Sequence, residues 1–221
     1  MTISLATSTI AHADTIVYAN SVTFQAALGT SITDTYSAPA YQHGNKYDGA
    51  DQDWFFNAAM SAVLGETDYE STQHSDFNLI RHTATNDYYC AGCNGSFKLT
   101  FDSTSVSDAS GVFGAGFNFV NTGGYTAFVT FGDMTTANYQ LPFVGQVGNT
   151  LPGFFGITSD LGIRSIYLGL NGQPTFNAVV AIDDLTIGNE STAASAVPDT
   201  ASSMGLLVLG LVAVALLKIV V

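Results

Sequence analysis

The sequence predicts an all-β protein: an antiparallel, jelly-roll-like β-sandwich with one or two short helices, followed by a C-terminal transmembrane-type helix. The 221 residues include 22 Gly, 15 Phe and 10 Tyr, a composition typical of strands joined by tight turns. Between residues 14 and 190, short alternating stretches recur with turn signals roughly every ten residues. No helical crossover separates them, so we expect antiparallel pairing in a single domain over residues 14–190.

Residues 97–101 show the alternation most clearly. Phe97, Leu99 and Phe101 alternate with Lys98 and Thr100, which predicts a strand with one face in the core. Ser21 is expected to cap one short helix, and residues 53–64 are expected to form another. Further strands are expected at residues 16–18, 111–120, 125–131, 154–158, 163–170 and 178–187.

The charge of the chain is strongly unbalanced. There are 18 acidic and 5 basic residues, a formal net charge of −13, and the basic residues are scattered singly. Nucleic-acid binding needs clustered Lys and Arg, so no nucleic-acid partner is expected. An acidic surface suits an exported protein and attracts cations.

Residues 1–13 are interpreted as a truncated signal peptide. Ala11 and Ala13 stand three positions and one position before Asp14, the small-residue pattern that signal peptidase accepts. The segment has no Lys or Arg and little apolar material, which a start codon assigned too far downstream explains. A disordered N-terminal tail is the alternative.

The C-terminal part divides into a linker with a short motif, residues 191–203, and a hydrophobic segment, residues 204–221. Met204–Leu217 carries no charged residue, and only Lys218 interrupts the apolar character that follows. A helix over residues 205–221 measures about 25 Å, close to the ~30 Å hydrocarbon core of a bilayer. The segment has no polar face, which argues against a helix in a soluble core.

Val197-Pro198-Asp199-Thr200, placed directly before this segment, resembles the sorting motif of PEP-CTERM proteins of Gram-negative bacteria in its Val-Pro-Asp form. The resemblance implies that a membrane-embedded exosortase recognises the motif and removes the tail, so that residues 204–221 lie in the inner membrane only transiently. It also implies delivery to the cell surface or extracellular matrix, with the exopolysaccharide of a biofilm. Family tails end in an Arg/Lys cluster, whereas this one has the single Lys218.

Three stretches of the domain are similar to the jelly-roll domains that commonly precede PEP-CTERM tails. They are residues 90–97, which contain Cys90 and Cys93, residues 154–159, and residues 181–188. This similarity implies a fold and an exported setting, and it implies no activity.

Cys90 and Cys93 are the only cysteines. A zinc site needs four ligands, and a redox pair is expected to open a helix, whereas Gly92 and the residues after Cys93 favour a turn. In an exported protein the pair is expected to form a local disulfide.

Asp183 is the candidate for a metal ligand. On a period of two, the strand expected over residues 179–187 places Asp183 on the face of Leu185 and Ile187, where a carboxylate needs donors or a cation. In carbohydrate-binding modules of this architecture a structural calcium often takes a carboxylate from the last strand, so Asp183 is a calcium candidate with Asp34 as a partner. Hydrogen bonds to loop amides are the alternative, and no other cofactor is expected.

Residues 39–95 hold the remaining candidates. Residues 48–53 resemble a calcium loop but lack the Gly and Glu that an EF-hand requires. His43, His74 and His82 are interpreted as solvated. Trp54, Phe55 and Phe56 form either an exposed sugar-stacking platform or, as we expect, the buried face of a helix.

The sequence contains no identifiable catalytic constellation, because abundant Ser and Asp guarantee coincidental groupings. We therefore expect a non-enzymatic surface or matrix protein, structural or glycan-binding. The alternative is a hydrolase acting on polysaccharide, which requires two facing carboxylates in a groove.

In a host that carries the matching exosortase, the exported protein is expected to lack residues 204–221. The intact mass of the exported form measures this. A tail retained in full would make the segment a simple membrane anchor.

Overall fold

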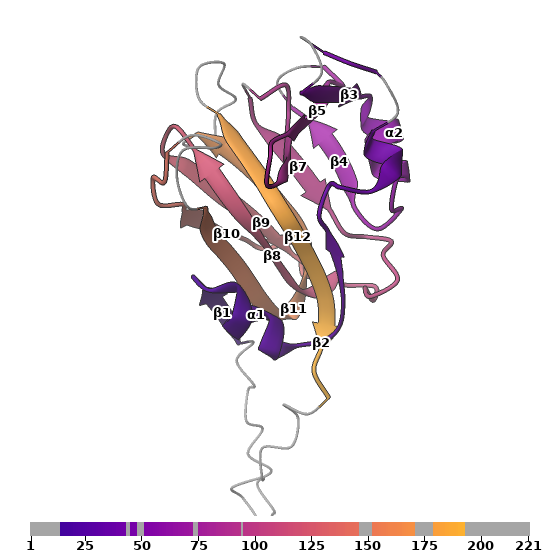
Figure 1. The fold of residues 1–221 in the computed structure, drawn as a ribbon. Coiled ribbons are helices and arrows are strands. Elements are labelled where there is room, and N and C mark those ends of the chain that lie inside the picture. Colours follow the sequence, from indigo (N-terminus) through magenta and orange to yellow (C-terminus); the bar gives the residue numbers. More distant parts are fainter. Residues whose placement is uncertain are drawn as a thin grey trace, which may run out of the picture. The chain divides into compact units, whose positions relative to one another are not determined.

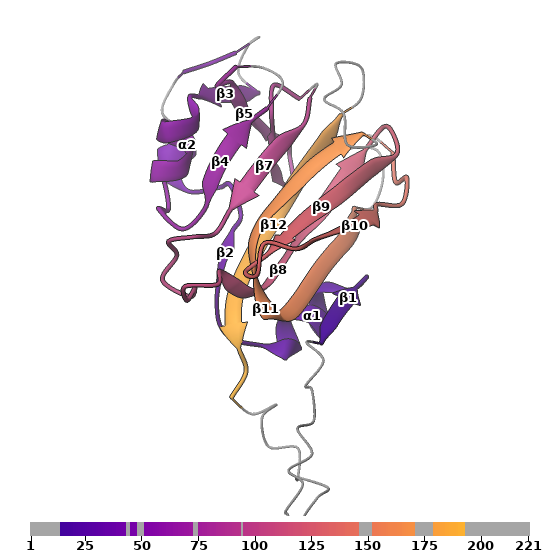
Figure 2. The same cartoon turned by 180° about the vertical axis from the view of Figure 1, so that it is seen from behind.

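The computed structural model describes residues 14–42, 45–47, 51–72, 75–93, 95–145, 152–170 and 179–192. Met1–Glu190 forms one compact unit, and Ser191–Val221 forms a second unit that lies almost wholly outside the described residues. The described part of the first unit is an antiparallel β-fold with two short α-helices, shown from opposite sides in Figures 1 and 2. In chain order its elements are β1 Thr15–Tyr18, α1 Ser21–Ala27, β2 Leu28–Asp34, the 3-10 helix Pro39–Tyr41, β3 Gln52–Phe55, α2 Asn57–Ala62, β4 Asp68–Ser71, β5 Asn78–His82, β6 Asp87–Cys90, β7 Phe97–Thr100, β8 Val112–Asn121, β9 Tyr125–Phe131, β10 Thr136–Gln140, β11 Gly153–Leu170 and β12 Val180–Glu190.

The strands form one curled sheet whose two layers share β11. The first half of β11 pairs with β8 and β1, and its second half pairs with β9 and β7. The first layer contains β10, β9, the second half of β11, β7 and β4, and the second layer continues from β8 through β12, β6 and β5 to β3. Figure 1 shows β12 and β2 on the near side, and Figure 2 shows β9 and β10 there.

One apolar core fills the space between the layers. Val129 of β9 and Ile166 of β11 meet Phe117 of β8 and Ile182 of β12 in a single buried cluster. Because side chains alternate along each strand, their neighbours in sequence point outward from the two layers. The predicted antiparallel sandwich is therefore confirmed, although its layers belong to one continuous sheet and not to the two separate sheets of a jelly roll.

A buried carboxylate fastens β2 to this core. Asp34 Oδ2 accepts hydrogen bonds from the hydroxyls of Tyr41, at 2.6 Å, and Tyr69, at 2.9 Å, and Oδ1 accepts one from the Tyr36 N–H at 3.0 Å. Burial raises the pKa of Asp34, and these donors oppose the rise. The arrangement joins β2, β4 and the 3-10 helix through one side chain.

Helix α1 covers the outer face of the second layer. Its N-cap is Asn20, one residue before the predicted Ser21, and the Asn20 side chain accepts from the N–H groups of Val22 and Thr23. Phe24 is fully buried against a floor of glycines, because a Cβ added at Gly116 or Gly156 would lie within 3 Å of its ring. Small residues in β8 and β11 thus make room for an aromatic ring.

The second predicted helix is shorter than expected. Residues 52–55 form β3, and only Asn57–Ala62 are helical. Pairing of β3 with β5 outweighs the helical pattern of this stretch. Among the described residues no helix is long and apolar enough to cross a membrane, and the segments 1–13, 197–200 and 204–221 lie outside them.

The packing of Phe24 on this glycine floor can be tested by substitution. Gly116→Ala places a Cβ about 2.9 Å from the Phe24 ring and 3.0 Å from the Gly156 Cα, and it should lower the free energy of unfolding by roughly 1–3 kcal/mol. Gly124→Ala is the matched control, because the nearest atom to its Cβ is Gln140 Nε2 at 3.4 Å. Urea unfolding compares the two, and equal effects would show that α1 does not rest on this floor.

Candidate functional site

A row of side chains crosses five strands on the outer face of the first layer. Register pairs join its members from β10 to β4. Ala127 and Val129, which flank the β9 member of the row, are both in the core, so the row points away from it. The members of this outer row are Asn138, Phe128, Tyr167, Lys98 and Glu70.

Two half-buried aromatic rings form the middle of the outer row. The ring centroids of Phe128 and Tyr167 are 5.7 Å apart, with 36° between the ring planes. A Cβ added at Gly169 would lie 2.8–2.9 Å from the Tyr167 ring, so this ring lies across Gly169. The absence of a side chain at Gly169 lets the ring lie along the strand next to Phe128.

A shallow groove runs beside Phe128. It has a volume of about 320 Å³ and is lined by Thr126, Phe128, Asn138 and Gln140. The Gln140 amide is held in place, because it donates to the Tyr125 carbonyl at 2.9 Å and accepts from the Thr126 hydroxyl at 3.3 Å. Aromatic rings beside fixed amide and hydroxyl groups can bind a ligand with an apolar face and a rim of hydroxyls.

Sequence reasoning did not select Phe128, Tyr167, Asn138 or Gln140. The stretch 125–131 was correctly predicted as a strand, and its alternation places Phe128 with Thr126 and Thr130 on the face that points away from the core. An aromatic residue between two outward threonines was the available signal. Its partner Tyr167 becomes a neighbour only through the pairing of β9 with β11.

Trp54 and Phe56 also lie at the surface, contrary to the expected buried helix face. Trp54 and Phe55 belong to β3, and only Phe55 points into the core. Phe56 is 54% exposed, and Trp54 is half-buried beside Phe77. These rings form a second outward aromatic group, on the other layer of the fold.

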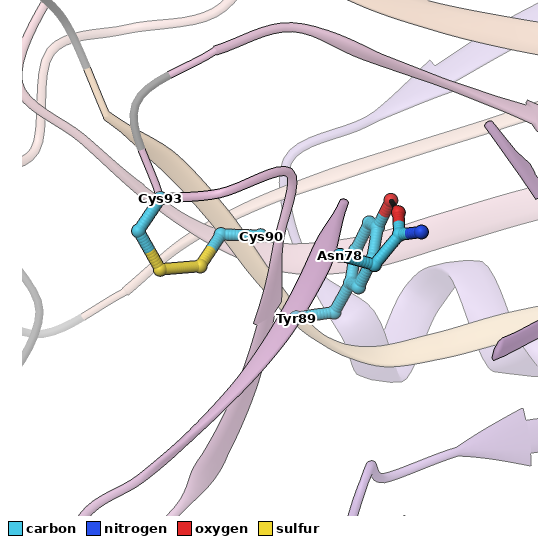
Figure 3. Close-up of a disulfide and its surroundings, with 4 residues drawn as sticks. All are labelled: Asn78, Tyr89, Cys90 and Cys93. Carbon is cyan, nitrogen blue, oxygen red and sulfur yellow. Dashed lines mark hydrogen bonds between the residues drawn. A yellow bond between two sulfur atoms is a disulfide. The ribbon is translucent and has the colours of Figure 1, made fainter. Parts of the chain in front are cut away.

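Cys90 and Cys93 form the predicted disulfide. It closes a turn in which Gly92 and Cys93 have positive φ angles of 58° and 49°. Figure 3 shows Cys90 and Tyr89 leaving β6 on opposite sides, the Tyr89 ring reaching Asn78. The Tyr89 hydroxyl donates to Asn78 Oδ1 at 2.7 Å, so the disulfide lies on the outer side of the strand.

The predicted facing of Asp183 is wrong, because β12 contains a bulge. Its register with β8 shifts between Asp183 and Thr186, and Asp184 adopts a positive φ of 51°. Leu185 and Ile187 consequently enter the main core without Asp183. Asp34 does not face Asp183 either, since it pairs in register with Leu185 and bonds the core tyrosines.

Asp183 is buried at the base of a polar pocket. The pocket has a volume of about 380 Å³ and is lined by Thr35, Ser37, Thr83, Ala84, Thr85, Asn86, Asp87, Asp183 and Asp184. Asp183 Oδ2 accepts from Asn86 Nδ2 at 2.9 Å, and Oδ1 accepts from the Asp184 N–H at 2.7 Å. Burial and the neighbouring charge of Asp184 raise the pKa of Asp183 to about 7.

Asp183 therefore accepts the hydrogen bonds expected as the alternative to a metal, one from the Asp184 backbone N–H and one from the Asn86 side-chain amide. Within the described ranges, no group of three or more His, Cys, Asp or Glu side chains is placed to hold a metal ion. The proposed calcium thus finds no such ligand group around Asp183 in that part of the chain.

The candidate loop at residues 48–53 ends in an ion-pair network. Asp53 is fully buried, and its Oδ2 lies 2.8 Å from Lys46 Nζ and 3.1 Å from His82 Nε2. Burial raises the pKa of Asp53, but the hydrogen bonds and charges of Lys46 and His82 prevail and hold it below its usual value. His82 also contacts Asp87 at 2.8 Å, so it is a paired residue and not a solvated one. Asp48, His43 and His74 lie outside the described residues.

Comparisons with known proteins identify distant similarity of fold. No protein-family model matches the sequence, and no curated protein matches it. Among solved structures, the chain is similar to a mutant of the family 29 carbohydrate-binding module CBM29-2, with a TM-score of 0.37, 14% identity, and coverage of 64% of this chain and 94% of that one. A CBM29-2 mutant complexed with cellulohexaose gives a TM-score of 0.35 and 14% identity, covering 65% and 95% of the two chains.

The pKa of Asp183 predicts an unusual dependence of stability on pH. The pKa of its carboxyl group is about 7 in the folded protein and 3.8 in a free chain. Between these two pH values the Asp183 carboxyl group is therefore ionised mainly in the unfolded chain. The free energy of unfolding should fall as pH rises through this window, by on the order of 3 kcal/mol.

Asp183→Asn should not show this fall in the free energy of unfolding. Thermal unfolding of wild type and variant between pH 4 and about 8 measures the difference in stability between them. Contributions from other groups, such as Asp34, are common to both proteins and cancel in this difference. Asp184→Asn is the matched control. It removes the neighbouring charge that helps to raise the pKa of Asp183 in the folded protein. The pH range over which stability is lost should therefore end at a lower pH. Parallel curves for wild type and Asp183→Asn would contradict the assignment.

Proposed function

We propose that residues 14–190 form a non-enzymatic glycan-binding domain of an exported protein that acts at the cell surface or in the extracellular matrix. The observation that carries the proposal is the Phe128–Tyr167 pair lying across Gly169 beside a groove of amide and hydroxyl groups. A pyranose ring presents C–H groups on its faces and hydroxyls around its edge. Rings that stack and amides that hydrogen-bond at their margin match both features.

The charge along the outer row indicates the class of glycan. Lys98 and Glu70 lie together at one end, whereas the centre and the other end carry only aromatic, amide and hydroxyl groups. A neutral ligand is therefore favoured over an acidic one. Five strands spaced about 4.8 Å apart give a row of about 19 Å, so we propose an extended oligosaccharide lying across the strands.

We further propose that the protein is exported and sorted by an exosortase-type protease that recognises Val197-Pro198-Asp199-Thr200. Two features support the exported setting. The Cys90–Cys93 disulfide is typical of oxidising compartments, and the chain carries a net charge of −13. In that setting, we propose an exopolysaccharide of the surrounding matrix as the ligand.

The polar pocket supports a second candidate function, a hydrolase acting on polysaccharide. Asp183, with its pKa of about 7, is suited to donate a proton, and Asp184 and Asp87 supply further carboxylates. Against this, Asp183 is only 4% exposed and both of its oxygens accept hydrogen bonds. Release of reducing ends by wild type and not by Asp183→Asn would establish the hydrolase in place of the binder.

Binding is tested on a glycan array with residues 14–190, followed by isothermal titration with cellulohexaose and the neutral oligosaccharides that the array retains. Tyr167→Ala should weaken binding at the outer row at least about tenfold, because the variant loses the stacking ring there. Tyr167→Phe should retain most of the affinity.

Phe143→Ala provides the matched control, since Phe143 is 70% exposed and belongs to neither aromatic group. Its affinity should equal that of wild type. An array on which no glycan is retained by the folded domain would refute the proposed function.

A further inference from the structure

The second aromatic group repeats the geometry of the first. The ring centroids of Trp54 and Phe77 are 5.8 Å apart with 36° between the planes, against 5.7 Å and 36° for Phe128 and Tyr167. Phe56 stands perpendicular to Trp54, at 4.9 Å and 89°. Trp54 and Phe77 therefore form a floor, and Phe56 forms a wall at its side.

This floor is fixed by the layers beneath it. Trp54, Phe77 and Cys93 pack on a small buried cluster that includes Leu79 and Cys90, so the disulfide supports the rings. On the inner side of β3, Asp53 is held by Lys46 and His82. The strand is thus anchored on one side while Trp54 faces outward on the other, which lowers the entropic cost of binding a ligand.

Polar side chains accompany these rings. Gln52 pairs in register with Arg81, two residues along the strands from the Trp54–Leu79 pair, and therefore lies on the same outer side of the sheet. Gln52 is half-buried and Arg81 is exposed. An amide and a guanidinium beside an aromatic floor offer a sugar ring the same combination of stacking and hydrogen bonding as the outer row.

The two aromatic pairs face away from each other. Phe128 and Tyr167 lie on the outer face of the first layer, and Trp54 lies on the outer face of the second, with the common core between them. Figures 1 and 2 show β3 and β5 beside α2 at one end of the fold, away from β9 and β10. A single short oligosaccharide on one pair therefore leaves the other pair open.

We infer that the Trp54–Phe77 floor with its Phe56 wall is a second binding site for a neutral glycan, so that one domain holds two glycan chains and cross-links them. This inference rests on the proposed function, since it assigns the same ligand class to both sites. The paired geometry favours a sugar over a protein partner, because each floor is two rings wide and has hydrogen-bonding groups at its edge.

The test compares wild type, Trp54→Ala, Tyr167→Ala, the double variant and the control Phe143→Ala. Isothermal titration with cellulohexaose, or with the neutral oligosaccharide that the array retains best, gives the number of sites. Two sites are expected in wild type and Phe143→Ala, one in each single variant and none in the double variant. Thermal unfolding checks that each variant is folded, and Trp54→Phe should restore the second site if Trp54→Ala does not fold.

Mixing with the corresponding long-chain polysaccharide measures cross-linking. Wild type and Phe143→Ala should increase turbidity, whereas either single variant should bind without doing so. One site in wild type that Tyr167→Ala abolishes and Trp54→Ala leaves intact would overturn the second site and keep the proposed function. Glycan binding by no protein in the set would refute both.

Discussion

The fold depends on the ability of one strand to serve both layers. β11 is 18 residues long, and its register with β9 shifts between Ile163 and Ser165, next to Gly162, whose φ is +72°. A side chain at Gly162 would lie 2.6 Å from the Ser110 carbonyl oxygen, so the strand can pass from one layer to the other only with glycine there. The partners of β11 on both sides, β8 and β1 before this point and β9 and β7 after it, are positioned by this change of direction.

The candidate site is a direct product of that strand. Tyr167 lies in the second half of β11, where β9 is on one side and β7 is on the other. Neither neighbour alone would make a platform: β9 supplies the second ring and β7 supplies Lys98. The proposed binding surface thus uses no specialised loop, only outward residues on strands whose inward residues already build the core.

Much of the fold followed from local patterns, and the errors have identifiable causes. Alternation predicted the strands at residues 97–101 and 125–131, and the expected exported setting with a turn at Gly92 predicted the Cys90–Cys93 disulfide. The facing of Asp183 was missed because a bulge at Asp184 interrupts the period of two. The outer row was missed because its five members come from separate strands and are brought together only by pairing.

The position of Trp54 gives the protein a built-in optical reporter. It is the only tryptophan in the chain, and it lies half-buried in an outward pair with Phe77 and not in the core. Light absorbed selectively by indole is therefore emitted from a single place on the surface. A ligand that shields the Trp54 ring from water shifts the emission wavelength, whereas a ligand bound at the outer row leaves it unchanged. Tryptophan fluorescence therefore distinguishes the two faces without any label.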